Sequence, residues 1–172
     1  MKKFSYSIME RQTPRHEFII DFCGDLKGKK ILDIGCSFGW FEKHAIENKS
    51  KKIVGIEPEE KYFLNAKNEV PEASFITASA ENLPFPDNSF DKVIMLEVLE
   101  HLPRGSEKMA LKEIFRVLSP DGELILSTPN LTLLNCILDP AIIFGHRHYS
   151  VNNIKDMLTK EGFIIKKIFL YG

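Results

Sequence analysis

The sequence contains few cysteines and no long apolar run. Its 172 residues include three cysteines, an odd number, and none of them forms a C-x-x-C pair. Such cysteine usage argues against a disulfide framework or a zinc knuckle and fits a reducing cytoplasm. No stretch is long enough to cross a membrane, and the first residues, MKKFSYSIMERQ, lack the apolar run of a secretory signal.

An excess of either charge is also absent. The chain carries 23 Lys and Arg against 24 Asp and Glu, which gives a formal net charge of −1. This balance provides no overall field for binding nucleic acid or an anionic membrane, and we find no basic stripe. Composition is that of a globular protein, so we expect one domain over residues 1–172. It comprises a helical segment (1–27), a core (28–130) and a C-terminal part (131–172).

Short apolar runs alternate with longer amphipathic stretches, as in βαβ units that build a parallel sheet. Four runs are nearly continuous aliphatics, which is typical of strands buried on both faces, and a fifth is weaker. The four cover residues 31–34, 53–56, 93–96 and 124–126, and the weaker one covers 74–78. A sixth run, 163–170, contains two lysines and suits a strand near an edge. We therefore predict an α/β fold, a Rossmann-like three-layer sandwich with a mostly parallel sheet.

Apolar residues at helical spacing predict helices between these strands. The clearest covers residues 108–118 and ends at the sequence SPDG (119–122), which predicts a turn before the next strand. Another covers 151–160, with Ser150 as its N-cap and Gly162 after its end. We also expect a first helix near residues 15–22 and one that begins at about Trp40.

A glycine-containing loop follows the first predicted strand in the sequence ILDIGCSFG (31–39). Gly35 allows a sharp turn and close approach to a ligand, and Gly39 allows close entry into the next helix. Glu57 ends the second strand about twenty residues on, where a carboxylate can accept both hydroxyl protons of a ribose. A dinucleotide fingerprint would need further glycines at positions 37 and 40, so a nicotinamide dehydrogenase is disfavoured. Asp33 suits an ammonium group, and the pattern favours a nucleoside with an amino-acid tail.

Four segments in this order resemble the class I S-adenosylmethionine-dependent methyltransferase superfamily, in its small-molecule, type 11-like branch. They are ILDIGCSFG, IVGIEPEE, ASAENLPFPDNSFDKVIMLEVLEHLP and LKEIFRVLSPDGELILSTPN, and the resemblance covers residues 28–165. It implies S-adenosylmethionine as cofactor and a cofactor-binding core over 28–130. The methionine part would be held by Asp33, Gly35, Cys36 and Gly39, the ribose by Glu57, and the adenine by Pro58 and the turn Ser79, Ala80 and Glu81.

The sequence departs from that family in three places. Ser37 stands where the family usually has glycine, and Ser79 where it usually has an aspartate for the adenine amino group. A serine hydroxyl accepts this hydrogen bond without the strength of a charged acceptor. The seventh, antiparallel strand is missing, so we expect either a sheet finished differently or a partner over its edge. A homodimer is our prediction.

For methyl transfer we predict two catalytic residues at the end of the fourth strand. His101 is the candidate base, and Glu97 borders the methionine end of the cofactor. A structural role for His101, capping a turn before Pro103, stays open. If a helical turn begins at Glu97, then Glu97, Glu100 and His101 share one face and could hold a divalent ion, although we predict no metal.

The acceptor is predicted to be a small molecule that is methylated on oxygen. His146 and His148 are candidates for its pocket, and the apolar segment 131–144 forms either a packed helix or a lid. We expect neither nucleic acid nor a membrane as partner. The rivals are a catalytically silent cofactor-binding or partner protein of this fold and an RNA methyltransferase.

Overall fold

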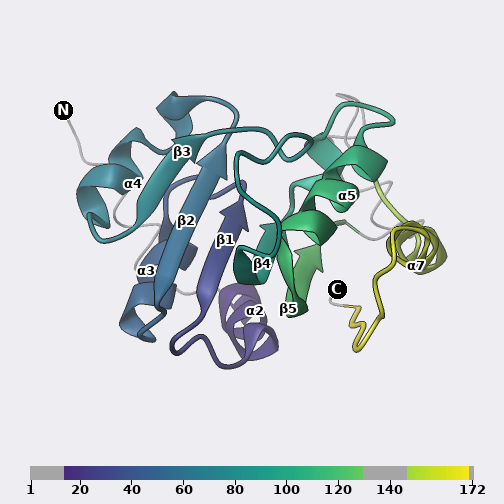
Figure 1. Cartoon of the computed structure of the whole chain (residues 1–172), viewed down its shortest axis with the longest axis horizontal. Coiled ribbons are helices and arrows are strands. Elements are labelled where there is room, and N and C mark those ends of the chain that lie inside the picture. The colour runs from purple at the N-terminus through teal and green to yellow at the C-terminus, as the bar shows by residue number, and fades with distance from the viewer. Residues whose placement is uncertain (1–13, 130–146, 171–172) are drawn as a thin grey trace.

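A five-stranded sheet, all of whose strands run parallel, forms the centre of the structure (Figure 1). The computed structural model describes residues 14–129 and 147–170. Its strands are β1 (Lys30–Ile34), β2 (Lys52–Glu57), β3 (Ser74–Thr77), β4 (Phe90–Leu96) and β5 (Leu118–Ser127), in the order β3-β2-β1-β4-β5. Each of the five strongest runs in the sequence is one of these strands, which confirms the predicted α/β fold. The strand order reverses at β1, and ligands of such sheets bind beyond the carboxyl ends of the strands at this point.

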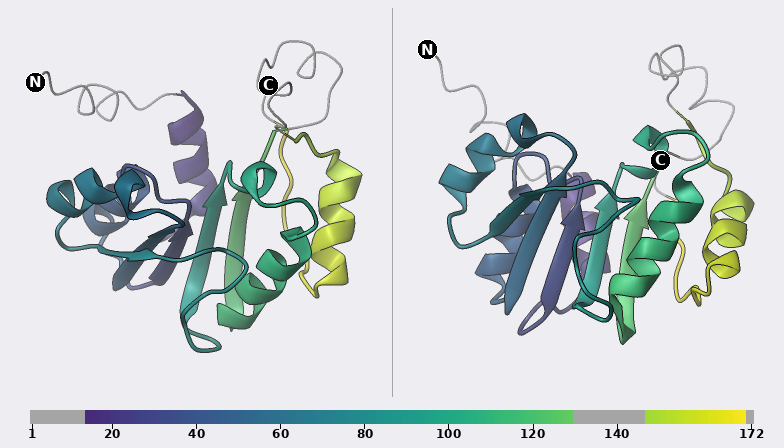
Figure 2. Two further views of the ribbon diagram at one scale, coloured as in Figure 1. Left: turned by 90° about the horizontal axis from the view of Figure 1, so that it is seen from above. Right: turned by 45° about the horizontal axis from the view of Figure 1, so that its top comes forward.

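Helices cover both faces of the sheet (Figure 2). Helices α2 (Pro14–Cys23) and α3 (Trp40–Glu47) lie on one face, and α5 (Glu107–Val117) and α7 (Val151–Lys160) on the other. Helix α4 (Leu64–Glu69) and two short 3-10 helices, η1 (Glu60–Tyr62) and η2 (Leu99–His101), complete the elements described here. Successive strand residues point to opposite faces. Ile31 therefore packs with α2 and α3, and Leu32 with α5.

The predicted helices are confirmed to within a few residues. Ala110, Leu111, Ile114 and Val117 of α5 are buried against the sheet, as the apolar stripe indicated. The hydroxyl of Ser150 accepts a hydrogen bond from the Asn153 amide at 3.2 Å, so it is the N-cap of α7. Helix α4 and both 3-10 helices were not predicted because they are too short to show a periodic pattern.

The prediction of a sixth strand was wrong. Residues 163–170 form no strand, and within the described residues β5 pairs only with β4. Lys166 instead binds the Glu123 carboxylate at 2.7 Å, and the Phe169 ring packs edge-on against Phe18 and Phe22, with ring centroids 5.6 and 5.4 Å apart. Side-chain contacts therefore direct this segment past β5 toward α2, and its backbone adds nothing to the β5 ladder.

The predicted turn at residues 119–122 lies inside β5. Phe90 is opposite Leu118 and Lys92 is opposite Glu123, so the four residues SPDG bulge out of the ladder against one residue of β4. Gly122 permits this bulge, since a Cβ there would lie 2.9 Å from the Ser119 carbonyl oxygen. The segment 131–144 lies outside the described residues. Among the helices that are described, none has the length and apolarity needed to cross a membrane.

Candidate functional site at the carboxyl edge of the sheet

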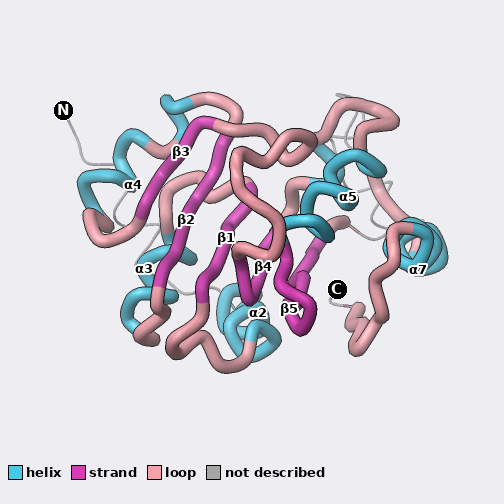
Figure 3. Tube along the Cα trace, viewed as in Figure 1, coloured by secondary structure: helices cyan, strands magenta, loops and turns pink. Residues whose placement is uncertain are grey.

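The loops that carry the predicted site residues lie at one edge of the sheet (Figure 3). Because all five strands are parallel, the segments after β1, β2, β3 and β4 leave the sheet at the same edge. The loop after β1 and the turn after β4 are neighbours there, since β1 and β4 pair from Ile31 opposite Lys92 to Ile34 opposite Met95. This is the switch point of the strand order, where α/β sheets bind ligands.

The loop after β1 is fastened to the end of β2. The backbone amides of Gly35 and Cys36 donate to the Ile56 carbonyl oxygen at 2.9 and 3.2 Å, and the Gly39 amide donates to the Cys36 carbonyl at 2.9 Å. Gly35 has φ +81°, and a Cβ on it would lie 2.3 Å from Cγ2 of Val98. Gly39 has φ +78°, and its Cβ would lie 2.8 Å from the Ala66 Cβ. Both positions therefore require glycine, and the loop lies close against its neighbours.

Ser37 connects this loop to Glu57. Its backbone has φ 45°, in the left-handed region, which explains why a glycine would also suit this position. The Ser37 amide donates to Oε1 of Glu57 at 2.9 Å. Glu57 is half-buried, and burial raises the pKa of its carboxyl while the Ser37 hydrogen bond lowers it. A ribose can therefore bind at Oε2 of a carboxylate that the loop itself holds in place.

Two buried carboxyl groups lie below the loop. Asp33 is 4% exposed and Glu42, in the first turn of α3, is 0% exposed. Burial raises the pKa of Asp33 to about 7, and burial and the nearby Asp33 charge raise the pKa of Glu42. The Cys36 thiol lies beside them, and its pKa is raised by burial and then by the Glu42 charge. Sequence analysis selected Asp33 and Cys36 but missed Glu42.

The turn after β3 lies beside Glu57. The Ala78 amide donates to the Glu57 carbonyl oxygen at 2.9 Å, and Ser79 and Asn82 close the turn through a backbone hydrogen bond of 3.2 Å. Ala80 is buried in the core, and Pro58 is exposed next to Glu57. Oε1 of Glu81 accepts a hydrogen bond from the Ser106 hydroxyl at 2.9 Å, so this carboxylate contacts the residue before α5. The predicted adenine and ribose contacts thus come from neighbouring segments.

The turn after β4 holds the two predicted catalytic residues. Glu97 has φ 55°, and its Oε1 accepts a hydrogen bond from the Ser127 hydroxyl at 2.7 Å. His101 is exposed at the end of η2. Glu100 is buried, and its Oε2 accepts from the Thr128 hydroxyl at 3.0 Å.

The alternative of a metal at this turn assumed that one helical face carries all three side chains. Because Glu97 is left-handed and the helical turn starts only at Leu99, the three side chains do not share a face. Within residues 14–129 and 147–170, no group of three or more His, Cys, Asp or Glu side chains could hold a metal ion. His146, a candidate for the acceptor pocket, lies outside the described residues.

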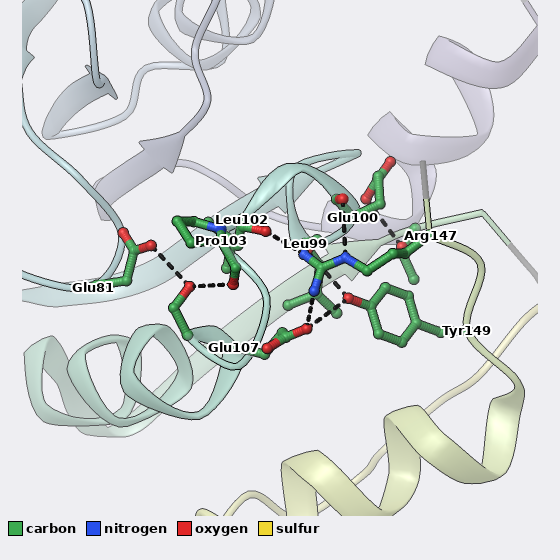
Figure 4. Close-up of polar contacts among 10 residues, drawn as sticks. Glu81, Leu99, Glu100, Leu102, Pro103, Glu107, Arg147 and Tyr149 are labelled. Carbon is green, nitrogen blue, oxygen red and sulfur yellow. Dashed lines mark hydrogen bonds and ion pairs between the residues drawn. The ribbon is translucent and has the colours of Figure 1, made fainter. Parts of the chain in front are cut away.

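Arg147 and Tyr149 fasten the turn after β4 to the start of α5 (Figure 4). The Arg147 guanidinium donates to the carbonyl oxygens of Leu99 at 3.0 Å, of Glu100 at 3.2 Å and of Leu102, and it forms an ion pair with Glu107. The Tyr149 hydroxyl donates to Oε1 of Glu107 at 3.1 Å. Sequence analysis selected the neighbouring His148, which is half-buried, and overlooked this pair. A cation beside three carbonyl groups stabilises the C-terminal end of η2, and this fixes the segment that carries His101.

Comparisons with known proteins agree with this geometry. A family model described as a methyltransferase domain matches residues 32–126, which is more than half of the chain. A probable S-adenosylmethionine-dependent methyltransferase of Mycolicibacterium smegmatis is 27% identical over 154 residues, which are 88% of this chain and 59% of that protein. A sterol 24-C-methyltransferase of Pneumocystis carinii is 33% identical and is matched over 63% of this chain and 30% of its own length.

A tRNA U34 carboxymethyltransferase of Nautilia profundicola is 32% identical over 60% of this chain and 35% of its own length. This chain therefore spans less than two thirds of each of these relatives. Among solved structures, an S-adenosylmethionine-dependent methyltransferase from Mesorhizobium loti superposes with a TM-score of 0.78 at 19% identity, over 92% of this chain and 84% of that one. This likeness confirms the Rossmann-like fold.

Proposed function

The chain belongs to the methyltransferase domain family, and from this premise we propose that it is an S-adenosylmethionine-dependent methyltransferase. The observation that carries the proposal is the loop after β1, which lies against Val98 and donates the Ser37 amide to Glu57. Beside this loop, we assign Glu57 as the acidic residue for a ribose and the buried Asp33 as the carboxylate for an amino group.

The residues of this edge fit the cofactor. Gly35 and Gly39 let the loop pack closely against Val98 and Ala66, because a Cβ at either position would clash with these neighbours. Glu57 has one oxygen bound to the loop and one available for ribose hydroxyls. Asp33, Gly35, Cys36 and Gly39 would hold the amino-acid part. Pro58, Ser79, Ala80 and Glu81 would surround the adenine.

S-adenosylmethionine supplies, when bound, an electrophilic methyl group on a sulfonium. The residues of this chain then have three tasks. Glu57 and the loop fix the direction in which an acceptor must attack, and alignment of this kind provides much of the rate in an in-line displacement. Glu97, held by Ser127, borders the reaction point with its negative charge. An imidazole nitrogen of His101 would accept the proton that the acceptor hydroxyl loses on methylation.

We infer a small-molecule acceptor that is methylated on oxygen. The formal net charge of −1 supports this inference, because it provides little attraction for a polyanionic nucleic acid. Similarity to the tRNA U34 carboxymethyltransferase favours RNA as the second candidate acceptor. A cofactor-binding protein without activity is the third candidate. A cytoplasmic location and a single domain stay predictions from the sequence.

Calorimetric titration with S-adenosylmethionine, S-adenosylhomocysteine and NAD tests the proposed function. We expect the first two to bind and NAD to show no binding, because Ser37 and Trp40 replace the glycines that a pyrophosphate needs. Radiolabelled methyl transfer into a small-metabolite extract and into total tRNA then separates the acceptor classes. Binding of NAD alone would refute the proposal. Cofactor binding without transfer to either pool would favour the inactive protein.

We also propose that the chain forms a homodimer on the β5 side of its sheet. Within the described residues β5 pairs only with β4, and Ile164 and Leu170 nearby are 90% and 67% exposed. Unpaired strand edges beside exposed apolar side chains are usually covered. Light scattering at micromolar concentration is expected to give twice the mass of the chain. A monomer mass at the same concentration would contradict the proposal.

A further inference from the structure

Glu42, in the first turn of α3, carries a fully buried carboxyl group. Its side chain is 0% exposed, and neither Oε1 nor Oε2 accepts a hydrogen bond from a donor group among the described residues. Gly55 of β2 makes room for it, since a Cβ at this position would lie 2.4 Å from Oε1. A buried carboxylate with no compensating donor is costly, so this group needs either a proton or a counter-charge.

The groups around Glu42 are mainly acidic. Asp33 of β1 is within hydrogen-bonding reach of the Glu42 carboxyl. Glu57 and the Cys36 thiol are close enough to interact electrostatically with Glu42. On the other side of Asp33, the Cys23 thiol lies near the Lys92 ammonium group. That ammonium group is already bound to the Cys23 carbonyl and Glu123, both at 2.8 Å. A hydrogen bond between the carboxyl groups of Asp33 and Glu42 requires one proton on the pair.

We propose that Glu42 is a positioning residue for the cofactor: it shares one proton with Asp33 in the empty site, and this proton leaves when the cofactor's ammonium group binds above Asp33. The inference rests on the proposed function for the identity of the ligand. A positive charge beside the pair favours its ionised form, because opposite charges attract strongly in a buried site. The ammonium group thus replaces the proton as the counter-charge.

The sign of the pH dependence follows from this exchange. Burial raises the pKa of both carboxyl groups, that of Asp33 to about 7 and that of Glu42 well above its usual range, so the folded pair keeps a proton that separate carboxyl groups in water would lose. Below this pH the empty pair holds its proton, and binding must release it, so affinity falls as the solution becomes more acidic. Between pH 5.5 and 6.5 we expect the dissociation constant to decrease roughly tenfold for one linked proton. This window lies below about 7.7, where an α-amino group begins to lose its own proton.

Calorimetry of S-adenosylhomocysteine in two buffers of different ionisation enthalpy measures the released protons directly. At pH 6.0 we expect about one proton per bound ligand for the wild-type chain. 5′-Deoxy-5′-methylthioadenosine, which lacks the amino-acid part, should bind without proton release. Glu42→Gln should abolish the release with S-adenosylhomocysteine, because its amide donates to Asp33 and leaves that group ionised. Glu69→Gln, an exposed glutamate on α4, is the matched control.

Thermal unfolding without ligand separates this inference from the proposed function. Because the folded pair binds a proton more tightly than the unfolded chain, wild-type stability should fall as pH rises from 5 to 8. The Glu42→Gln profile should be flatter. Equal profiles, or equal proton release in both proteins, would overturn the inference. If S-adenosylhomocysteine does not bind the wild-type chain at all, the proposed function fails, and a flatter Glu42→Gln profile would still support the shared proton.

Discussion

Affinity for S-adenosylhomocysteine is expected to fall about 100-fold when Glu57 is replaced by alanine, since hydrogen bonds to a charged group contribute about 1.5–3 kcal/mol each. Two effects combine. The ribose loses a paired acceptor, and the Ser37 amide loses its 2.9 Å hydrogen bond to Oε1, which loosens the loop after β1. Calorimetric titration at pH 7.5 measures the change.

Two further variants separate these effects. Glu57→Gln keeps an oxygen for the Ser37 amide but removes the charge, so it should weaken binding by a smaller factor. Glu59→Ala removes an exposed carboxylate that contacts Lys61 at 2.6 Å and should leave the affinity unchanged. If Glu57→Ala bound the ligand as tightly as Glu59→Ala does, Glu57 would not be the ribose-binding residue.

Gly35→Ala is expected to destabilise the protein by about 3 kcal/mol, which combines overpacking with the strain of a left-handed alanine. The new Cβ would lie 2.3 Å from Cγ2 of Val98, and the backbone has φ +81°. For a chain of this size the loss corresponds to a decrease in melting temperature of roughly 6–12 °C. Cofactor binding should be lost with it, because the loop must move away from Val98. Thermal unfolding and calorimetry measure the two effects.

Gly105→Ala is a close control for this prediction. Gly105 has a similar φ of +87°, but nothing lies within 4 Å of the position that a Cβ would take. Only the backbone strain remains, so we expect a loss of about 1 kcal/mol. Adding Val98→Ala to Gly35→Ala should recover part of the stability by removing the clash. Equal melting temperatures for Gly35→Ala and Gly105→Ala would show that the close contact with Val98 does not determine the conformation of the loop after β1.

The strands and long helices could be predicted from the sequence because their signals are local. A run such as residues 53–56 is aliphatic at every position, and only a strand covered on both faces buries all of it. The stripe of α5 repeats at helical spacing for the same reason. Residues 163–170 resemble a strand equally well. Their side chains contact Glu123, Phe18 and Phe22. Because these partners are distant in the sequence, no local pattern predicts that the segment leaves the sheet.

The candidate site was predictable only where backbone geometry requires a particular residue. Gly35 and Gly39 could be recognised in the sequence because each position combines a positive φ with neighbours that leave no room for a Cβ. Glu42 was missed because a glutamate at the start of a helix usually faces solvent. The sequence signal for the buried Glu42 is in β2. Gly55 interrupts a run of β-branched residues there, and a glycine inside a strand indicates that another group approaches closely. Arg147 was missed because three of its partners are backbone carbonyl groups, which any sequence supplies, and its ion-pair partner Glu107 is forty residues away in the sequence.

The hydrogen bond between Tyr149 and Pro129 affects how much the length of the sequence between them can differ among homologous proteins. The Tyr149 amide donates to the Pro129 carbonyl oxygen at 3.0 Å, and Arg147 holds the same segment on the turn after β4. The backbone at Pro129 and the backbone at Tyr149 are therefore held next to each other. For a connection whose ends are already joined, doubling its length costs only about 0.6 kcal/mol in closure entropy. A change in the number of residues between these two anchors therefore costs little closure entropy, so we expect homologous proteins to differ in length there.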